Sequence, residues 1–225
     1  MYPGISIALS IIILWTGHLA YSLFFVDVQA GNPWLYVHIL LQAHLSTGLF
    51  ITGHDGMHGT IKPHNKAVNT ALGTVASFLY AGLSFRRLKT NHQKHHELAG
   101  RPGDPDYSEK SQHFLVWYFT FMWRYLTVWQ ILIMAGLFNL LLIGFSEAQL
   151  LLLWILPAFM STFQMFYFGV YAPHRQPHSK DMMPYRSRTL PKNHLWAFLS
   201  CYFFGYHYEH HASPGTPWWK LYTKK

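Results

Sequence analysis

Long runs of apolar residues dominate the pattern along this chain. Four of them are long enough to cross the hydrocarbon core of a bilayer, which takes about 20 residues; they cover residues 5–26, 34–52, 126–145 and 150–171. A fifth run, residues 67–85, is rich in Ala, Gly and Ser and only moderately apolar. The pattern predicts an all-α integral membrane protein with four transmembrane helices.

The basic residues predict how these helices cross. If residues 67–85 stay on one side, the connections on the other side, residues 27–33 and 146–149, contain no Lys or Arg, and all seventeen basic residues fall on the first side or at its boundary. Short loops rich in Lys and Arg stay in the cytoplasm, so we expect that face to be cytoplasmic. Residues 67–85 would then be re-entrant, interfacial or a buried hairpin. The aromatic-rich segments 115–125 and 195–206 would lie at the interface as part of a cap.

The composition fits a membrane protein and narrows the choice of partners. Hydrophobic residues make up 51% of the chain and charged residues only 12%, which argues against a soluble domain. The net charge of +8 indicates contact with a membrane surface rather than with nucleic acid, because the basic residues lie between the apolar runs. The sequence has no internal repeat and no separate soluble segment. We therefore predict one membrane-embedded domain over residues 1–225.

Histidines form three short clusters with the spacing of metal ligands. Eight of the sixteen histidines follow the patterns His54-x-x-x-His58, His92-x-x-His95-His96 and His207-x-x-His210-His211. Residues three and four apart share one face of a helix, and a neutral imidazole binds iron, zinc, copper or nickel well. The predicted topology places all three clusters on the cytoplasmic face. A single His-x-x-x-His pair is common on helix surfaces, but three clusters in one chain indicate more than one metal ion.

Iron suits these clusters better than zinc. A structural zinc site closes with four ligands and usually recruits cysteine, whereas this chain has many imidazoles and only Cys201. The sequence also lacks a nucleophile arrangement, so no catalytic residue is predicted beyond the metal centre itself. We expect non-haem iron.

Five segments around the clusters carry a family resemblance. They are residues 52–59 (TGHDGMHG), 91–96 (NHQKHH), 102–107 (PGDPDY), 168–175 (FGVYAPHR) and 207–211 (HYEHH). These segments closely resemble the bacterial and cyanobacterial beta-carotene 4-ketolases of the membrane fatty acid hydroxylase and desaturase superfamily. The three clusters alone indicate the superfamily, and residues 104–107 and 168–175 are closer to the ketolase branch.

The resemblance implies a membrane oxygenase with two iron ions, which uses O2 and electrons from ferredoxin or a similar donor. Its carotenoid substrate, beta-carotene or zeaxanthin, would enter from lipid. The C4 methylene of a β-ionone ring would become a ketone by two successive hydroxylations and loss of water, giving echinenone and canthaxanthin from beta-carotene. The enzyme would lie in the cell inner membrane or the thylakoid membrane, with its active site on the cytoplasmic face.

One more histidine from outside the clusters is expected, because the superfamily often supplies one. His174 lies just past the fourth span and is the preferred candidate. His178 is the competitor, although Pro177 between the two disfavours a continuous helix. The predicted metal ligands are His54, His58, His92, His95, His96, His174, His207, His210 and His211.

Acidic residues beside the clusters are candidates for orienting the ligand rings. They are Asp55, Asp104, Asp106 and Glu209. Two of them, Asp104 and Asp106, could equally form a turn between prolines, and Glu209 could be a solvated surface residue. For the substrate tunnel the candidates are aromatic, and packing or an interfacial belt is the alternative for each: Phe78, Tyr80, Phe163, Phe166, Tyr167 and Phe203. Basic loop residues that could dock an acidic electron donor are Arg86, Arg87, Lys89, Lys94 and Arg101.

Three other functions compete with ketolation. A carotenoid 3-hydroxylase and a fatty acid desaturase or hydroxylase would use the same clusters. A non-catalytic membrane metal-binding or transport protein is the third alternative. A transporter buries its ligands near the bilayer midplane, whereas these clusters fall at the ends of the predicted spans.

Overall fold

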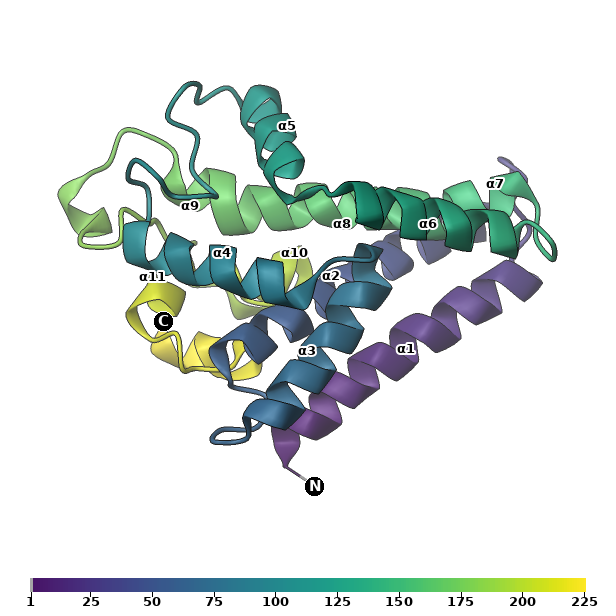
Figure 1. Cartoon of the computed structure of the whole chain (residues 1–225), viewed down its shortest axis with the longest axis horizontal. Helices are drawn as coiled ribbons and strands as arrows, with labels where there is room; N and C mark the ends of the chain where they lie inside the picture. The colour runs from purple at the N-terminus through teal and green to yellow at the C-terminus, as the bar shows by residue number, and fades with distance from the viewer. Residues whose placement is uncertain (1) are drawn as a thin grey trace.

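The computed structural model describes residues 2–225, and over these residues it contains helices and no strand (Figure 1). The α-helices are α1 Pro3–Phe25, α2 Pro33–His58, α3 Lys66–Ala81, α4 Phe85–Leu98, α5 Phe114–Tyr125, α6 Val128–Leu141, α7 Glu147–Leu150, α8 Leu156–Phe166, α9 Ala172–His174, α10 His194–Cys201 and α11 His207–Ala212. Two π-helical turns, η1 Leu151–Ile155 and η2 Tyr167–Tyr171, join α7, α8 and α9 into one long helix. Two 3-10 turns, η3 Lys180–Met182 and η4 Trp218–Lys224, complete the structure.

Three helices are long and apolar enough to cross a membrane, namely Pro3–Phe25, Pro33–His58 and Glu147–His174. Two bent helix pairs, α3 with α4 and α5 with α6, are also long and apolar enough to span a membrane if each pair counts as one span. By length and composition, the number of spans is therefore three to five. The prediction of an all-α membrane protein is confirmed at this level.

The third predicted span, residues 126–145, differs from the straight helix that its sequence suggested. Helix α6 has only 14 residues, and it leaves α5 at an angle of 89°. The break occurs because Leu126 and Thr127 are extended and the Thr127 hydroxyl accepts a hydrogen bond from the Gln130 N–H at 3.1 Å, which starts a new helix. The span therefore bends where the sequence is still apolar.

Residues 67–85 were predicted not to cross the membrane as a straight helix, and the structure shows a local cause for a bend there. Gly82 ends α3 with a left-handed backbone at φ 66°, and the Ser84 side chain caps α4. The two helices meet at 101°, which is the geometry of a broken span or a re-entrant segment. This bend directs α4 across the end of α2, where the histidines of both helices can meet (Figure 1).

Helix α2 is central and packs against α1, α3 and α8. It approaches α3 closely because small residues face each other. A Cβ added at Gly56 would lie 2.8 Å from the Asn69 carbonyl oxygen and 3.0 Å from the Gly73 Cα. Such contacts between small residues let membrane helices come close together. They also fix α2 at the turns that carry His54 and His58.

Replacing Gly56 by Leu should therefore destabilise the protein. The new side chain would displace α3 backbone, and overpacking of this kind costs about 1–3 kcal/mol or more. Thermal unfolding in detergent is expected to occur at a lower temperature, with less metal retained. Gly136→Leu on α6 is the matched control, since a Cβ there meets nothing within 4 Å. Equal unfolding temperatures for the two variants would contradict the packing argument.

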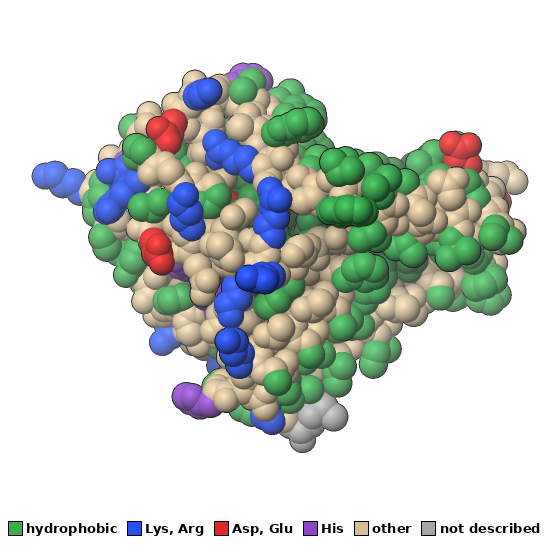
Figure 2. Space-filling model, in the orientation of Figure 1, with side chains coloured by type: hydrophobic (Ala, Val, Ile, Leu, Met, Phe, Trp, Pro, Cys, Tyr) green, Lys and Arg blue, Asp and Glu red, His purple; other side chains and the backbone are tan. Residues whose placement is uncertain are grey.

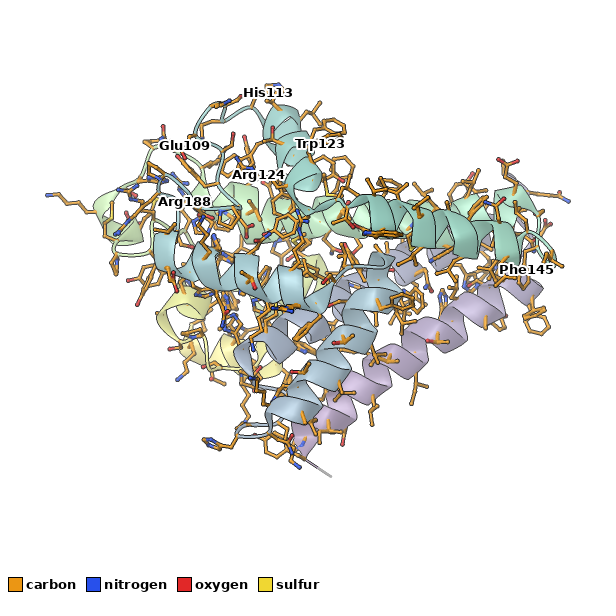
Figure 3. The ribbon with its side chains drawn as sticks, viewed as in Figure 1. Glu109, His113, Trp123, Arg124, Phe145 and Arg188 are labelled. Atoms are coloured by element: carbon orange, nitrogen blue, oxygen red, sulfur yellow. The ribbon has the colours of Figure 1, made fainter. Side chains whose placement is uncertain are left out.

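The two connections without Lys or Arg lie at the same end of the molecule. The Gln149 side chain donates to the Leu23 carbonyl at 2.8 Å, and Phe24 packs edge-on against Phe145. Glu109 and Arg188 lie at the opposite end from Phe145 in Figure 3. Figure 2 shows Lys and Arg gathered over α4 and the start of α3, whereas apolar side chains cover the end that carries α6. Charge and apolar surface are thus separated along the molecule.

Candidate metal centre

Helices α2, α4, α9 and α11 bring their histidines together in two groups. His54, His58, His92 and His210 form group one, and His95, His174, His207 and His211 form group two. Within each group, one ligand nitrogen from every ring lies within 4.8 Å of the others. Rings from residues as far apart as 54 and 210 therefore face a common point.

Helical spacing explains how α4 and α11 serve both groups. On α4, His92 and His96 are four residues apart and share a face, while His95 points to group two. Helix α11 has the reverse assignment, because His207 and His211 share group two and His210 joins group one. The repeated His-x-x-His-His pattern thus places rings around two neighbouring points.

Distances within group one match those around an ion. The Nε2 atoms of His58 and His92 are 2.7 Å apart, and those of His54 and His210 are 3.2 Å apart. His96 adjoins this group, with its Nε2 3.1 Å from His92 Nε2 and 2.9 Å from His210 Nε2. Metal–imidazole bonds of about 2.1 Å at right angles hold neighbouring nitrogens about 3 Å apart. The nitrogens of group one are therefore spaced as ligands of one ion would be.

Group two has buried nitrogens without hydrogen-bond partners. His95 and His174 are each 1% exposed, and the Nε2 atoms of both have no partner among residues 2–225. Their other ring nitrogens are held: His95 Nδ1 lies 3.0 Å from both oxygens of Asp104, and His174 Nδ1 donates to the Arg186 carbonyl at 3.0 Å. A buried polar atom left unpaired costs about 1–3 kcal/mol. This arrangement, with one nitrogen anchored and the other free, is typical of metal ligands.

The α11 histidines are in the form that binds metals. Burial, followed by the neighbouring histidines, lowers the pKa of His207, His210 and His211 well below the ordinary value. These rings are therefore neutral at physiological pH, and a neutral imidazole has a lone pair for an ion.

Asp104 combines the two roles that the sequence left open. Its carboxylate accepts backbone N–H bonds from Gly100 and Asp106, both at 2.8 Å, which closes a turn. The same carboxylate orients His95. Burial would raise the pKa of Asp104, but the His95 ring and the backbone N–H bonds from Asp106 and Gly100 together outweigh burial, and the pKa is lowered. Asp106 lies one step further away, with Oδ2 3.9 Å from His95 Nδ1 and Oδ1 accepting from the Tyr125 hydroxyl.

The other two acidic candidates do not orient a ligand ring. Asp55 accepts the Trp218 N–H at 3.2 Å, and its nearer oxygen is 3.8 Å from His54 Nδ1, too far for a hydrogen bond. Glu209 accepts from the Thr189 hydroxyl and pairs with Lys225 at 3.4 Å. The prediction for Glu209 is corrected, because on α11 it points away from the face that carries the histidines. Asp55 instead ties the C-terminal segment to α2.

His174 and His178 are separated by the structure. His174 belongs to group two, whereas His178 donates from Nε2 to the His174 carbonyl at 2.9 Å and is in neither group. A π-helical turn, η2, immediately precedes α9, and it sets the direction of His174 at the end of the long helix.

Comparison with known proteins decides the family. The profile of the family described as "Fatty acid desaturase" matches residues 31–132 and 113–223. The chain belongs to the fatty acid desaturase family. No solved structure matches it.

Within this family, the curated relatives are carotenoid ketolases. The chain is 38% identical to "Zeaxanthin 4-ketolase" of Chlamydomonas reinhardtii, over 97% of this chain and 52% of that protein. It is 33% identical to "Beta-carotene 4-ketolase 3" of Haematococcus lacustris, over 97% of this chain and 77% of the relative. It is 34% identical to "Beta-carotene ketolase" of Paracoccus sp. (strain PC1), over 97% of this chain and 90% of the relative. The chain thus spans about half the length of the Chlamydomonas protein and most of the other two, and the resemblance found in its sequence is confirmed.

An apolar cavity borders both histidine groups of this desaturase-family protein. His54, His92, His95 and His207 form part of its wall. The remaining lining is mostly apolar and includes Phe50, Met57, Leu88, Phe121, Met165 and Phe204. An apolar molecule in this cavity would lie directly against the rings.

Of the six aromatic residues predicted to line a tunnel, Tyr80 lines this cavity and the other five do not. Phe166 is fully buried in a cluster with Trp117 and Tyr118. Phe78, Phe163 and Tyr167 are exposed on the outer surface, and Phe203 packs near Trp218. Along α8 and η2 the cavity is lined by Thr162, Met165 and Gly169 instead. The spacing of three and four residues between these positions could have predicted this lining face from the sequence. The prediction chose aromatic residues instead, and these lie on the neighbouring face of the helix.

Proposed function

We propose that this chain is a carotenoid ketolase that converts the C4 methylene of a β-ionone ring to a ketone. Two successive O2-dependent hydroxylations at C4 would give a geminal diol, which loses water. The observation that carries this proposal is the meeting of two histidine groups beside an apolar cavity, in a chain 33–38% identical to proteins named as ketolases.

The residues fit two iron ions. Group one with His96 would hold one ion, and group two would hold the other. Neither group contains a cysteine or a carboxylate, which is unlike a closed structural zinc site. Bound iron would supply the one-electron chemistry that activates O2 and removes a hydrogen from C4. The protein's own contribution is to anchor the rings, through Asp104 on His95 and the Arg186 carbonyl on His174.

The cavity wall has its own role in the reaction. Its apolar side chains would hold the β-ionone ring with C4 toward the histidines and keep bulk water from the site. A rigid polyene could reach this position sideways from lipid.

The proposed topology has four spans, formed by α1, α2, the bent pair α5 and α6, and the long helix from α7 to α9. The bent pair α3 and α4 would be re-entrant, and the whole chain would be a single domain. The histidine groups would lie on the cytoplasmic face of the inner or thylakoid membrane. Support comes from the two connections without Lys or Arg at the opposite end and from the basic surface in Figure 2.

A ferredoxin-type donor would supply electrons at the basic surface. A hollow beside group one is lined by His58 together with Lys66, Lys89 and His64. His58 belongs to group one and also borders this hollow. Only the His58 side chain would therefore separate a donor bound in the hollow from the ion of group one. Positive side chains at the rim favour an acidic carrier.

Lys89→Glu is expected to raise the KM for reduced ferredoxin about five- to tenfold, with a smaller change in kcat. The reversed charge repels an acidic donor, and the effect should shrink as salt screens it. Steady-state turnover measured against donor concentration at two ionic strengths checks this. Lys180→Glu is the control, because Lys180 lies in η3 and outside the hollow. An equal effect of both variants would place the donor elsewhere.

Expression in a host that makes beta-carotene tests the main proposal. Ketocarotenoids in the extract, absent from cells with empty vector, are expected. Zeaxanthin would identify a 3-hydroxylase instead, and an altered acyl chain would identify a lipid desaturase or hydroxylase. Tightly held zinc with no iron in the purified protein would favour a non-catalytic metal protein.

A further inference from the structure

The carboxamide of Gln130 has one unused polar atom in an apolar environment. Gln130 lies in the first turn of α6 and is 8% exposed. Its Nε2 donates to the Ala81 carbonyl at 2.9 Å, which fixes the orientation of the amide. Its Oε1 is buried and has no hydrogen-bond partner among residues 2–225.

Gln130 stands between two apolar spaces. The first is the cavity that borders the histidines. The second is a cleft between α6 and the helix formed by η1 and α8, with a wall that includes Ile131, Met134, Phe138, Leu151 and Phe159. Four residues belong to both walls: Ala81, Met122, Gln130 and Thr162. The two spaces therefore adjoin at these four residues, and a molecule that crosses this boundary, here called the passage, contacts Gln130.

Thr162, the other residue of the shared wall with a polar side chain, already has hydrogen-bond partners. The Thr162 hydroxyl donates to the Phe159 carbonyl at 2.8 Å and contacts the Tyr118 hydroxyl at 2.6 Å. Asp106 lines only the cavity beside the histidines, where its Oδ1 accepts from the Tyr125 hydroxyl. In the shared wall, Gln130 Oε1 is thus the side-chain acceptor available to a molecule in the passage.

An unpaired buried acceptor favours an occupant that brings a donor. A site built to hydrogen-bond a hydroxyl discriminates against an analogue without one, because the analogue leaves the buried group unpaired. An unsubstituted carotenoid is a hydrocarbon with no donor. A carotenoid hydroxylated on C3 of its end ring carries a donor one carbon away from the reacting C4.

We propose that Gln130 Oε1 accepts a hydrogen bond from a hydroxyl group on the end ring of the carotenoid, which makes Gln130 a determinant of substrate specificity. This inference rests on the proposed ketolase function. It assigns hydroxylated rings as preferred substrates over unsubstituted rings, and Gln130 as the origin of that preference.

Competition for binding tests the assignment without turnover. The full chain, purified in lipid nanodiscs and kept anaerobic without a reductant, is incubated with equal amounts of zeaxanthin and beta-carotene, and the bound carotenoids are separated by chromatography. The wild type should retain more zeaxanthin. Gln130→Met, which is similar in length and lacks the acceptor, should lower the bound ratio about three- to tenfold, as expected for one hydrogen bond. Asn139→Met, a control at an exposed amide of α6 outside both walls, should keep the wild-type ratio.

The same pair of substrates in a turnover competition gives the second readout. The ratio of the two kcat/KM values should fall in Gln130→Met by a factor similar to that of the bound ratio. Because both quantities are ratios within one sample, a smaller folded fraction cancels. An unchanged ratio in Gln130→Met, or an equal fall in Asn139→Met, overturns the assignment. If the wild type forms no ketone from zeaxanthin and none from beta-carotene, the ketolase proposal is refuted. The ratio of bound carotenoids would still decide the role of Gln130.

Discussion

Replacing His95 by Ala is expected to remove iron from the protein and to lower ketone formation more than about 100-fold, beyond the 10- to 100-fold typical of losing a group that only supports a ligand. His95 is 1% exposed, its Nε2 faces group two, and its Nδ1 is held by Asp104. The substitution deletes a proposed ligand and leaves the Asp104 carboxylate buried without its His95 partner. Iron per polypeptide from elemental analysis and ketocarotenoid from chromatography measure the two effects.

His113→Ala is the control for that experiment. His113 is exposed, precedes α5, belongs to neither histidine group and lies at the edge of the molecule in Figure 3. It should retain wild-type iron and ketone formation. A His95→Ala protein that still holds two irons and forms ketone would exclude group two as a metal site.

The local part of the centre could be predicted from the sequence because it depends on helical periodicity. A separation of three or four residues places His92, His95 and His96 on neighbouring positions of one helix, whatever the rest of the chain does. The same holds for α11. What the spacing leaves undetermined is which ring serves which group, since that depends on how α4 crosses α2. The 101° bend at Gly82 sets this crossing.

Predictions that depended on which face of a helix points toward the cavity were less successful. The long helix from α7 to α9 contains two π-helical turns, η1 and η2. A π-helical turn adds a residue to the turn and changes which face the following residues occupy. Thr162 and Met165 consequently line the cavity, while Phe163 and Phe166 lie on other faces. The prediction for Glu209 failed for a similar reason. Glu209 is next to His210 in the sequence, but adjacent residues lie on different faces of a helix such as α11.

The second large effect is expected at His174, the proposed ninth ligand, where the structure adds most to the sequence. Replacing His174 by Ala should lower iron content and abolish ketone formation, because its Nε2 is buried without a partner and faces group two. His178→Ala should cost less than about tenfold, since it removes one hydrogen bond to the His174 carbonyl. The same iron and ketone measurements apply to both variants. A severe His178 variant beside a mild His174 variant would reverse the assignment, and it would require the loop after α9 to fold back onto group two.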